Sequence, residues 1–190
     1  MPHIHTEPDQ HDMTVSAYVV LRDGDTWKCL VHMHKKLNVY MQIGGHIELT
    51  ETPWQALEHE LLEESGYTLA ELQILQPGLK QAVRSGSVSH PIPYNMNTHT
   101  AGEGHFHSDT CYAFVAKSIP KRPPNEDESQ NLKWLTMQEL EELVTQKKTL
   151  LDVIEMYDSI LTDGMRIYSQ QPASEFSLKK PSNLSQDEDY

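Results

Sequence analysis

Three glutamates near the middle of the chain, Glu60, Glu63 and Glu64, have the spacing that places side chains on one face of a helix. At about 100° per residue they span an arc of about 100°. Their like charges repel one another, and no lysine or arginine occurs from Leu37 to Leu79 to offset them. Because hard divalent cations prefer carboxylate oxygens, the cluster predicts a site for Mg²⁺ or Mn²⁺. A solvated acidic helix is the alternative interpretation.

The helix that carries these glutamates has clear limits in the sequence. Thr52 fits the N-cap, Pro53 fits the first helical position, and Gln55 completes a capping box with Thr52. Gly66 fits the C-terminal position that favours a left-handed backbone. We therefore expect a helix over about residues 53–65.

Two further features of this stretch predict how the helix is placed. Trp54, Leu57 and Leu61 lie on a different side from the glutamates, so that side can face a core. Gly44 and Gly45 precede the helix, and glycine allows the backbone to approach a ligand closely. The pattern indicates a helix with one core-facing side and a separate carboxylate side, preceded by a glycine segment that can approach a ligand.

The stretch from Gly45 to Tyr67 resembles the motif of the Nudix hydrolases, G-x5-E-x7-R-E-U-x-E-E-x-G-U, in which U is an apolar residue. The residues that match the motif with its spacing are Gly45, Glu51, Glu60, Leu61, Glu63, Glu64, Gly66 and Tyr67. The one clear departure is His59, which stands where the family has arginine. The resemblance covers about residues 13–163.

The resemblance implies a metal site. In the family, the residues that match Glu60, Glu63 and Glu64 bind a divalent metal, with help from the carbonyl that matches Gly45. For this chain we therefore expect Mg²⁺, or else Mn²⁺, as the cofactor.

The resemblance also implies catalytic roles. In the family, the residue that matches Glu51 pairs with the motif arginine, and here His59 is shorter and only partly charged near neutral pH. Glu63 or Glu60 is the candidate general base, and Glu103 in a later loop is a third candidate.

The expected reaction is hydrolysis of a pyrophosphate linkage in a nucleoside diphosphate joined to another group. A nucleotide-sensing module that does not hydrolyse its ligand is the alternative, and His59 is the feature that favours it. An isopentenyl diphosphate isomerase would need a catalytic cysteine in a context that neither Cys29 nor Cys111 matches. Four segments also resemble a MutT-like subgroup of largely unassigned substrate: KKL at 35–37, GGHIE at 44–48, HPIP at 90–93 and GHFHSD at 104–109.

A second polar group lies in the predicted strand 105–116, where His105, His107 and Asp109 alternate and so share one face. These side chains could line a substrate pocket, hold a second metal of the zinc or iron type, or form an ordinary polar sheet face. With Glu103 they are the candidate substrate-binding residues. Residues 85–104 are expected to form a long loop.

The order of elements predicts an α/β fold, an α/β/α sandwich with a mixed β-sheet and helices on both faces, and the resemblance implies the same Nudix-type fold. We expect a flexible N-terminal segment at residues 1–12, the Nudix hydrolase domain at 13–163, and a polar C-terminal tail at 164–190. The further expected strands are 14–21, 27–34, 46–48, a short strand within 67–75, 80–84 and 131–135, and a short segment at 39–43 leads into Gly44. The further expected helices are 137–144 and 150–161, the latter ended by Gly164.

Composition narrows the class of protein. The 190-residue chain has a formal net charge of −13, which disfavours binding to a nucleic acid polymer. The sequence lacks a run of 18 apolar residues and a signal peptide, so we expect a cytoplasmic protein with no membrane contact. The two cysteines are expected to be buried free thiols. A homodimer remains open.

Overall fold

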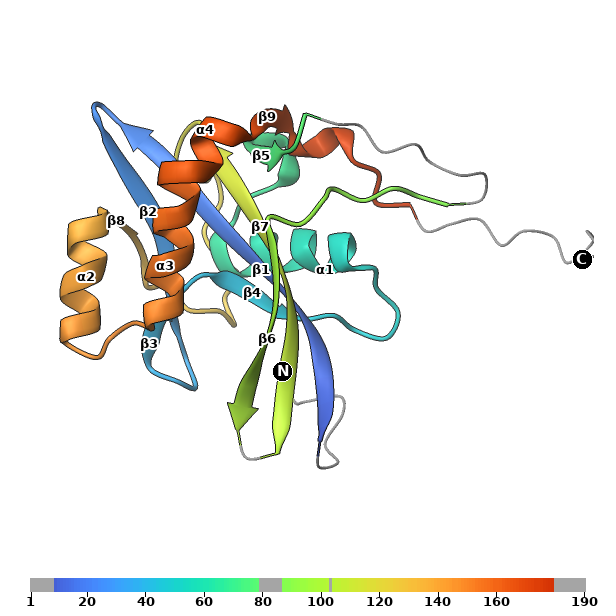
Figure 1. Ribbon diagram of the computed structural model, residues 1–190, viewed down its shortest axis with the longest axis horizontal. Helices are drawn as coiled ribbons and strands as arrows, with labels where there is room; N and C mark the ends of the chain where they lie inside the picture. Colours follow the sequence, from blue (N-terminus) through green and yellow to red (C-terminus); the bar gives the residue numbers. More distant parts are fainter. Residues whose placement is uncertain (1–8, 79–86, 103, 180–190) are drawn as a thin grey trace, which may run out of the picture.

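A mixed β-sheet forms the centre of the computed structural model, which describes residues 9–78, 87–102 and 104–179 (Figure 1). In this described part the sheet has nine strands, in the order β3-β2-β1-β7-β5-β9, with β4 paired to β1, β6 to β7 and β8 to β2. The strands are β1 (Gln10–Asp23), β2 (Thr26–His34), β3 (Val39–Met41), β4 (Ile43–His46), β5 (Leu72–Gln76), β6 (Asn95–Gly102), β7 (His105–Ala116), β8 (Leu132–Leu135) and β9 (Ser169–Pro172). The α-helices are α1 (Pro53–Glu60), α2 (Met137–Thr145), α3 (Leu151–Ser159) and α4 (Met165–Ile167).

Strand β1 holds the sheet together. It is 14 residues long and rich in β-branched residues, which favour extended backbone. On one side its C-terminal end pairs with β2 and its middle pairs with β4, both antiparallel. On the other side it runs parallel to β7, with Gln10 opposite His105 and Leu21 opposite Ala116. The mixed sheet that the sequence predicts is therefore confirmed.

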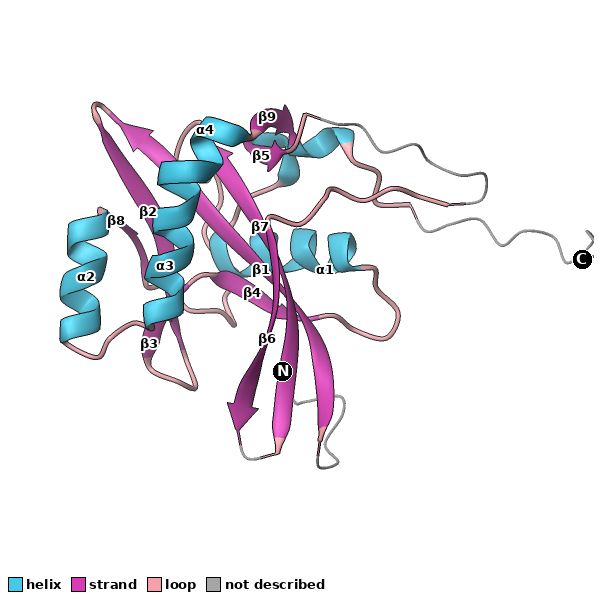
Figure 2. Ribbon diagram, in the orientation of Figure 1, coloured by secondary structure: helices cyan, strands magenta, loops and turns pink. Residues whose placement is uncertain are grey.

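Alternation along β1 and β7 sends successive side chains to opposite faces of the sheet. Val15, Ala17 and Val19 join the core under α1, whereas Tyr18 and Val20 join the core under α2 and α3. Figure 2 shows these helices as separate layers about the strands. The predicted α/β/α sandwich is confirmed.

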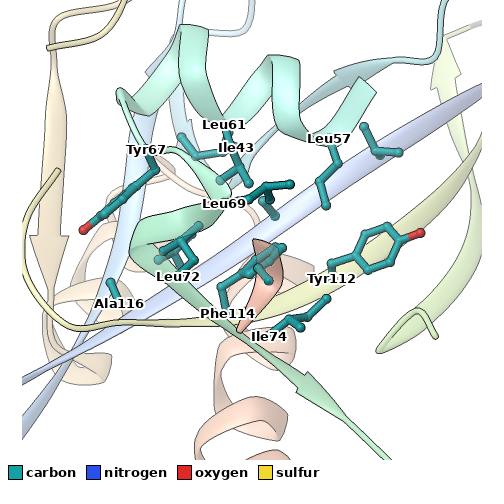
Figure 3. Close-up of a cluster of buried hydrophobic side chains, with 14 of the residues drawn as sticks. Ile43, Leu57, Leu61, Tyr67, Leu69, Leu72, Ile74, Tyr112, Phe114 and Ala116 are labelled. Atoms are coloured by element: carbon teal, nitrogen blue, oxygen red, sulfur yellow. The ribbon is translucent and has the colours of Figure 1, made fainter. Parts of the chain in front are cut away.

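The core under α1 fixes the position of that helix on the sheet. Figure 3 shows Leu57 of α1 and Leu61, which directly follows α1, above Tyr112 and Phe114 of β7. Trp54 is fully buried, and its ring meets that of Tyr112 edge-on at a centroid distance of 5.5 Å. The apolar side expected for this helix is therefore the side that it buries.

Residues 95–102, expected to belong to a loop, form strand β6 instead. They pair antiparallel with β7 over Asn95 to Gly102, although most of their side chains are exposed. The sequence NMNTHTAG has no alternation of apolar and polar residues, because neither face of this strand is fully covered. Backbone hydrogen bonds to a long neighbouring strand supply the order that a sequence pattern could not indicate.

Both segments that the sequence placed outside the domain, residues 1–12 and 164–190, contain residues that belong to it. Strand β1 starts at Gln10, and Asp12 is fully buried, so residues 10–12 belong to the sheet and not to a flexible segment. At the other end, β9 pairs with β5, and Ala173 is buried in the core under α1. Residues 169–179 therefore include a strand and core contacts, where the sequence predicted a polar tail.

The last helical region also differs from its expected end. Gly164 has a helical backbone, and the chain continues into α4. A Cβ atom at Gly164 would lie 3.1 Å from the ring of Tyr94 and 3.3 Å from Leu75. Close packing, and not helix termination, therefore favours glycine here. The expected strand at 80–84 lies outside the described residues. The short strand expected within 67–75 is β5, which follows a 3₁₀ turn at residues 69–71.

Among the residues that the structure describes, no helix has the length and apolarity needed to cross a membrane.

We predict that Phe176→Ala destabilises the protein by about 1–3 kcal/mol, a part of the usual cost of truncating a fully buried phenylalanine. The Phe176 ring lies 6.0 Å from that of Trp54 and is half-buried against the core under α1. Urea unfolding would measure the free energy of unfolding, with the exposed Ser174→Ala as control. Equal stability of the two variants would show that this segment does not support the core.

Candidate active site

The helical segment formed by α1 and the turn after it begins at Pro53 and ends before Gly66, as the sequence predicts. Thr52 is the N-cap: its hydroxyl accepts from the Gln55 backbone N–H at 3.3 Å, and the Gln55 side chain accepts from the Thr52 N–H at 3.0 Å. After Glu60 the helix widens into a π turn over Leu61–Ser65, and Gly66 closes it with a left-handed φ of 77°. Such π turns are frequent at functional sites, and no sequence signal indicated this one.

Glu60 lies against the glycine-rich segment. Its side chain is buried, with 6% of the residue exposed. A Cβ atom built on Gly45 would lie 2.1 Å from Glu60 Oε1, so only glycine leaves room for this carboxylate. The structure thus brings together Gly45 and Glu60, which the sequence assigned to one metal site.

Glu64 reaches the same segment from the π turn. Its Oε2 accepts a hydrogen bond from the Gly44 backbone N–H at 2.9 Å. The same oxygen lies 3.6 Å from Nε2 of His32 in β2, and both side chains are almost completely buried. His32 carries no specific sequence signal for this site, because it is a histidine that alternates with apolar residues in a buried strand.

The Glu63 carboxylate is turned toward different partners. His59 Nε2 lies 3.0 Å from Glu63 Oε1, and His59 Nδ1 lies 3.3 Å from Glu51 Oε1. The imidazole therefore reaches between the two carboxylates, and the pairing with Glu51 expected for the family arginine is present with histidine.

A distal loop completes the site. The backbone N–H of Asn125 donates to the Glu63 carbonyl at 2.8 Å, and the Asn125 amide donates to Glu63 Oε1 at 3.1 Å. Gly66 permits this docking, since a Cβ there would lie 2.1 Å from the Arg122 carbonyl oxygen. Asn125 gave no sequence signal, because its contact with Glu63 spans 62 residues.

The same loop brings a further carboxylate near the cluster. The charge of Glu128 contributes to the raised pKa values of both Glu60 and Glu64. Lys35 forms an ion pair with Glu128 at 3.9 Å. Of the three acidic residues at 126–128, Glu128 is therefore the one whose charge acts on the cluster.

Burial controls the ionisation of the buried groups. It raises the pKa of Glu60 to about 7, with smaller contributions from Glu63 and Glu128, while the charge of His59 opposes the rise. Burial also raises the pKa of Glu64 well above its usual value and lowers that of His32 to about 4. Without a cation, the interior of this site favours neutral side chains.

His59 shows the opposite balance. Burial alone would lower its pKa, but the nearby charges of Glu63, Glu51 and Glu60 outweigh that effect and raise it. The imidazole is therefore more often a cation than an isolated histidine, and so it resembles the arginine that it replaces.

The buried carboxylates fit a divalent cation. Glu60 and Glu64 converge on the backbone of residues 44–45, and within the described part of the chain neither forms an ion pair with a lysine or an arginine. A hard cation would offset the cost of burying these charges.

The predicted substrate-binding residues do not all lie together. His105 and His107 are close to Asp12, whereas Asp109 is buried and accepts from the Thr14 hydroxyl at 2.9 Å and from Cys111 Sγ at 3.1 Å. Glu103 lies outside the described residues. The alternation along β7 puts these histidines on the sheet face opposite α1, and a role for them in substrate binding stays a prediction.

Comparison with known proteins decides the family. The model of the NUDIX domain matches residues 12–154. The chain belongs to the Nudix family. With the enzyme signature intact at its carboxylates, the protein is a Nudix pyrophosphohydrolase. A comparison with curated proteins found no match.

Solved structures with the Nudix fold are similar over most of their length. A hydrolase of the NUDIX family from Clostridium perfringens is 27% identical with a TM-score of 0.59, covering 76% of this chain and 92% of that one. The Ap4A hydrolase of C. elegans in a binary complex is 15% identical with a TM-score of 0.56, and the match covers 79% of this chain and 97% of that one. The NUDIX domain of Shewanella oneidensis NrtR, complexed with ADP ribose, is 16% identical with a TM-score of 0.56, and the match covers 80% of this chain and 90% of that one.

We predict that Gly45→Ala lowers kcat/KM by about 100-fold or more, because misplacing a positioned group by about 1 Å can cost that much. The new methyl group would displace the Glu60 carboxylate. Gly78→Ala is the control, since a Cβ there meets nothing within 4 Å. Steady-state kinetics and Mg²⁺ titration would measure the effect, and an unchanged Mg²⁺ affinity would contradict the close approach of Gly45 and Glu60.

We also predict that Glu60 lowers the stability of the metal-free protein as pH rises from about 4.5 to about 7, in the opposite direction to buried His32, whose lowered pKa adds stability over part of this range. The folded pKa of Glu60 lies above its usual value, so in this range the folded state binds more protons than the unfolded state. Mg²⁺ must displace those protons, and it should therefore raise Tm more at pH 8 than at pH 6. Thermal melts with chelator or Mg²⁺ would measure this, with Glu60→Gln as the variant that reduces the difference.

Proposed function

We propose that this Nudix pyrophosphohydrolase requires Mg²⁺ or Mn²⁺ and cleaves a nucleoside diphosphate linked to another group, such as a sugar, a phosphate or a second nucleoside. The observation that carries the proposal is the burial of Glu60 and Glu64 against the backbone of Gly44 and Gly45. Buried carboxylates that lack a lysine or arginine partner in the described part of the chain require a cation to stay ionised.

The proposed metal ligands are Glu60, Glu63 and Glu64, with the carbonyl of Gly45. When bound, a divalent cation neutralises phosphate charge and lowers the pKa of a coordinated water. The protein contributes the fixed positions: the Gly44 N–H orients Glu64, and the tight fit at Gly45 orients Glu60.

Glu63 is the carboxylate that we assign as general base. Glu60 and Glu64 are buried, whereas the Glu63 side chain is 36% exposed and so can meet a water molecule. His59 and Asn125 hold one of its oxygens at 3.0 Å and 3.1 Å, which fixes the direction of the other. A base must lie within hydrogen-bond reach of the proton that it accepts, and these contacts limit where Glu63 can point.

The class of substrate is supported by the related folds. Structures similar to this chain include an Ap4A hydrolase and a domain complexed with ADP ribose. Ap4A and ADP ribose are both derivatives of a nucleoside diphosphate. The net charge of −13 fits a small nucleotide-type substrate held by metal better than a nucleic acid polymer. The two buried free cysteines fit a cytoplasmic location.

A nucleotide sensor without hydrolysis is the second candidate, because His59 departs from the family arginine. The contacts of His59 weigh against it, since this side chain pairs with both Glu51 and Glu63. Hydrolysis of a nucleotide substrate by the purified protein distinguishes the two functions.

We predict that the purified protein hydrolyses one member of a panel of NTPs, ADP-ribose, NADH, dinucleoside polyphosphates and nucleotide sugars when Mg²⁺ or Mn²⁺ is present. Glu63→Gln should lower the rate by about 10²–10⁴-fold, the usual contribution of a general base. Glu141→Gln, at an exposed position of α2, is the matched control. Phosphate release and product chromatography would measure the reaction.

Two outcomes would contradict this function. Turnover that persists in excess chelator would exclude the metal requirement. Tight metal-dependent nucleotide binding without turnover in any member of the panel would favour the sensor, and His59→Arg would then test whether the histidine accounts for the missing activity.

A further inference from the structure

A second group of metal-ligating side chains lies at the N-terminal ends of β1 and β7. In Figure 1 these ends project with β6 beyond the helices. Asp12, His105 and His107 each offer a ligand atom there, and these atoms all lie within 4.8 Å of one another. Asp12 belongs to β1 and the two histidines belong to β7. The two strands are parallel neighbours, and Asp12 lies opposite His107.

This group is separate from the carboxylate site. Asp12 shares the face of β1 that carries Tyr18 and Val20, which pack under α2 and α3. Gly45 faces Glu60 of α1 on the other side of the sheet. A metal held by Asp12 would therefore have different ligands and different surroundings from one held by Glu60.

The distance between Asp12 and His105 is that of neighbouring ligands in a coordination shell. His105 Nε2 lies 3.3 Å from Asp12 Oδ2, and His46 Nε2 lies 3.5 Å from the same oxygen. With zinc–ligand bonds of about 2.0–2.1 Å, neighbouring ligands of a tetrahedral site are about 3.3–3.4 Å apart. The Asp12 oxygen and the His105 nitrogen are already at that separation, and His107 offers a ligand atom within 4.8 Å of both.

Burial makes the arrangement more than a surface cluster. Asp12 is fully buried, and the side chains of His46 and His105 are only 11% exposed. The ring of His107 lies 5.0 Å from that of His46 and 5.5 Å from that of His105, both nearly perpendicular. Several imidazoles thus surround one buried carboxylate, which is costly unless their charges are balanced.

We propose that Asp12, His105 and His107 bind a borderline divalent metal of the zinc class. Two imidazole nitrogens and one carboxylate oxygen are a ligand set for zinc or iron(II), and Mg²⁺ prefers all-oxygen sites. His46 is a positioning residue that orients the Asp12 carboxylate. The metal would join β1 to β7 and brace β4, the strand that contains Gly45.

Zinc binding to the full chain would test this site without any reference to hydrolysis. Chelator-stripped protein is titrated with Zn²⁺ against a chromogenic zinc chelator in excess Mg²⁺, which occupies the carboxylate site. We expect one Zn²⁺ per chain and a rise in Tm with zinc. Asp12→Asn and the double variant His105→Gln/His107→Gln should weaken zinc binding by about 100-fold or more, since loss of even an outer-shell partner costs about 10–100-fold.

Three control variants define the location. His11→Gln should bind zinc as the wild type does, because His11 is next to Asp12 but is exposed. The double variant His3→Gln/His5→Gln should also keep the zinc, and that result would exclude these two N-terminal histidines as its ligands. Glu60→Gln/Glu63→Gln should keep the zinc as well, so failure of the proposed function leaves this result unaffected.

The proposal is overturned if Asp12→Asn and His105→Gln/His107→Gln both retain wild-type zinc affinity, or if the zinc is lost only from Glu60→Gln/Glu63→Gln. Circular dichroism of the metal-free variants accompanies the titration. Asp12→Asn preserves the shape of the side chain, so it tests the site even where the double variant fails to fold.

Discussion

The structure depends most on the contact between two buried carboxylates and the backbone of Gly44 and Gly45. Glu64 accepts the Gly44 N–H, and Glu60 fills the space that a Cβ atom at Gly45 would occupy. Burial raises the pKa of both carboxylates, so the folded chain favours their neutral forms when no cation is present. The cation proposed for this site would keep them ionised, and its binding would link catalysis to stability at this point of the fold.

The elements around this contact hold it from several directions. The apolar side of α1 anchors the helix on β7, and β1 holds β4 with its glycines in front of that helix. The loop that contains Asn125 closes over the π turn and fixes Glu63. His59 illustrates how a departure from a family motif can be accommodated, because it pairs with both Glu51 and Glu63, and their charges raise its pKa.

Strand β1 gives the two faces of the sheet distinct chemistry. One face meets the oxygen-rich cluster of α1, and the other meets imidazoles from β4 and β7 around Asp12. Because alternate residues of a strand point to opposite faces, neighbours such as Gly45 and His46 contribute to different groups. The sheet thus separates a hard, oxygen-based site from a nitrogen-rich one by a single layer of backbone.

The sequence by itself determined what local spacing encodes. The capping box at Thr52, the left-handed Gly66 and the apolar side with Trp54 fix one helix, and that helix carries its candidate ligands with it. Only the tertiary structure decided that β6 and β9 are strands, that Glu128 acts on Glu60, and that Asp12, not Asp109, meets His105. The reason is physical: periodicity and capping act between residues a few positions apart, whereas strand pairing and contacts across about 90 residues depend on which backbones the whole core brings side by side.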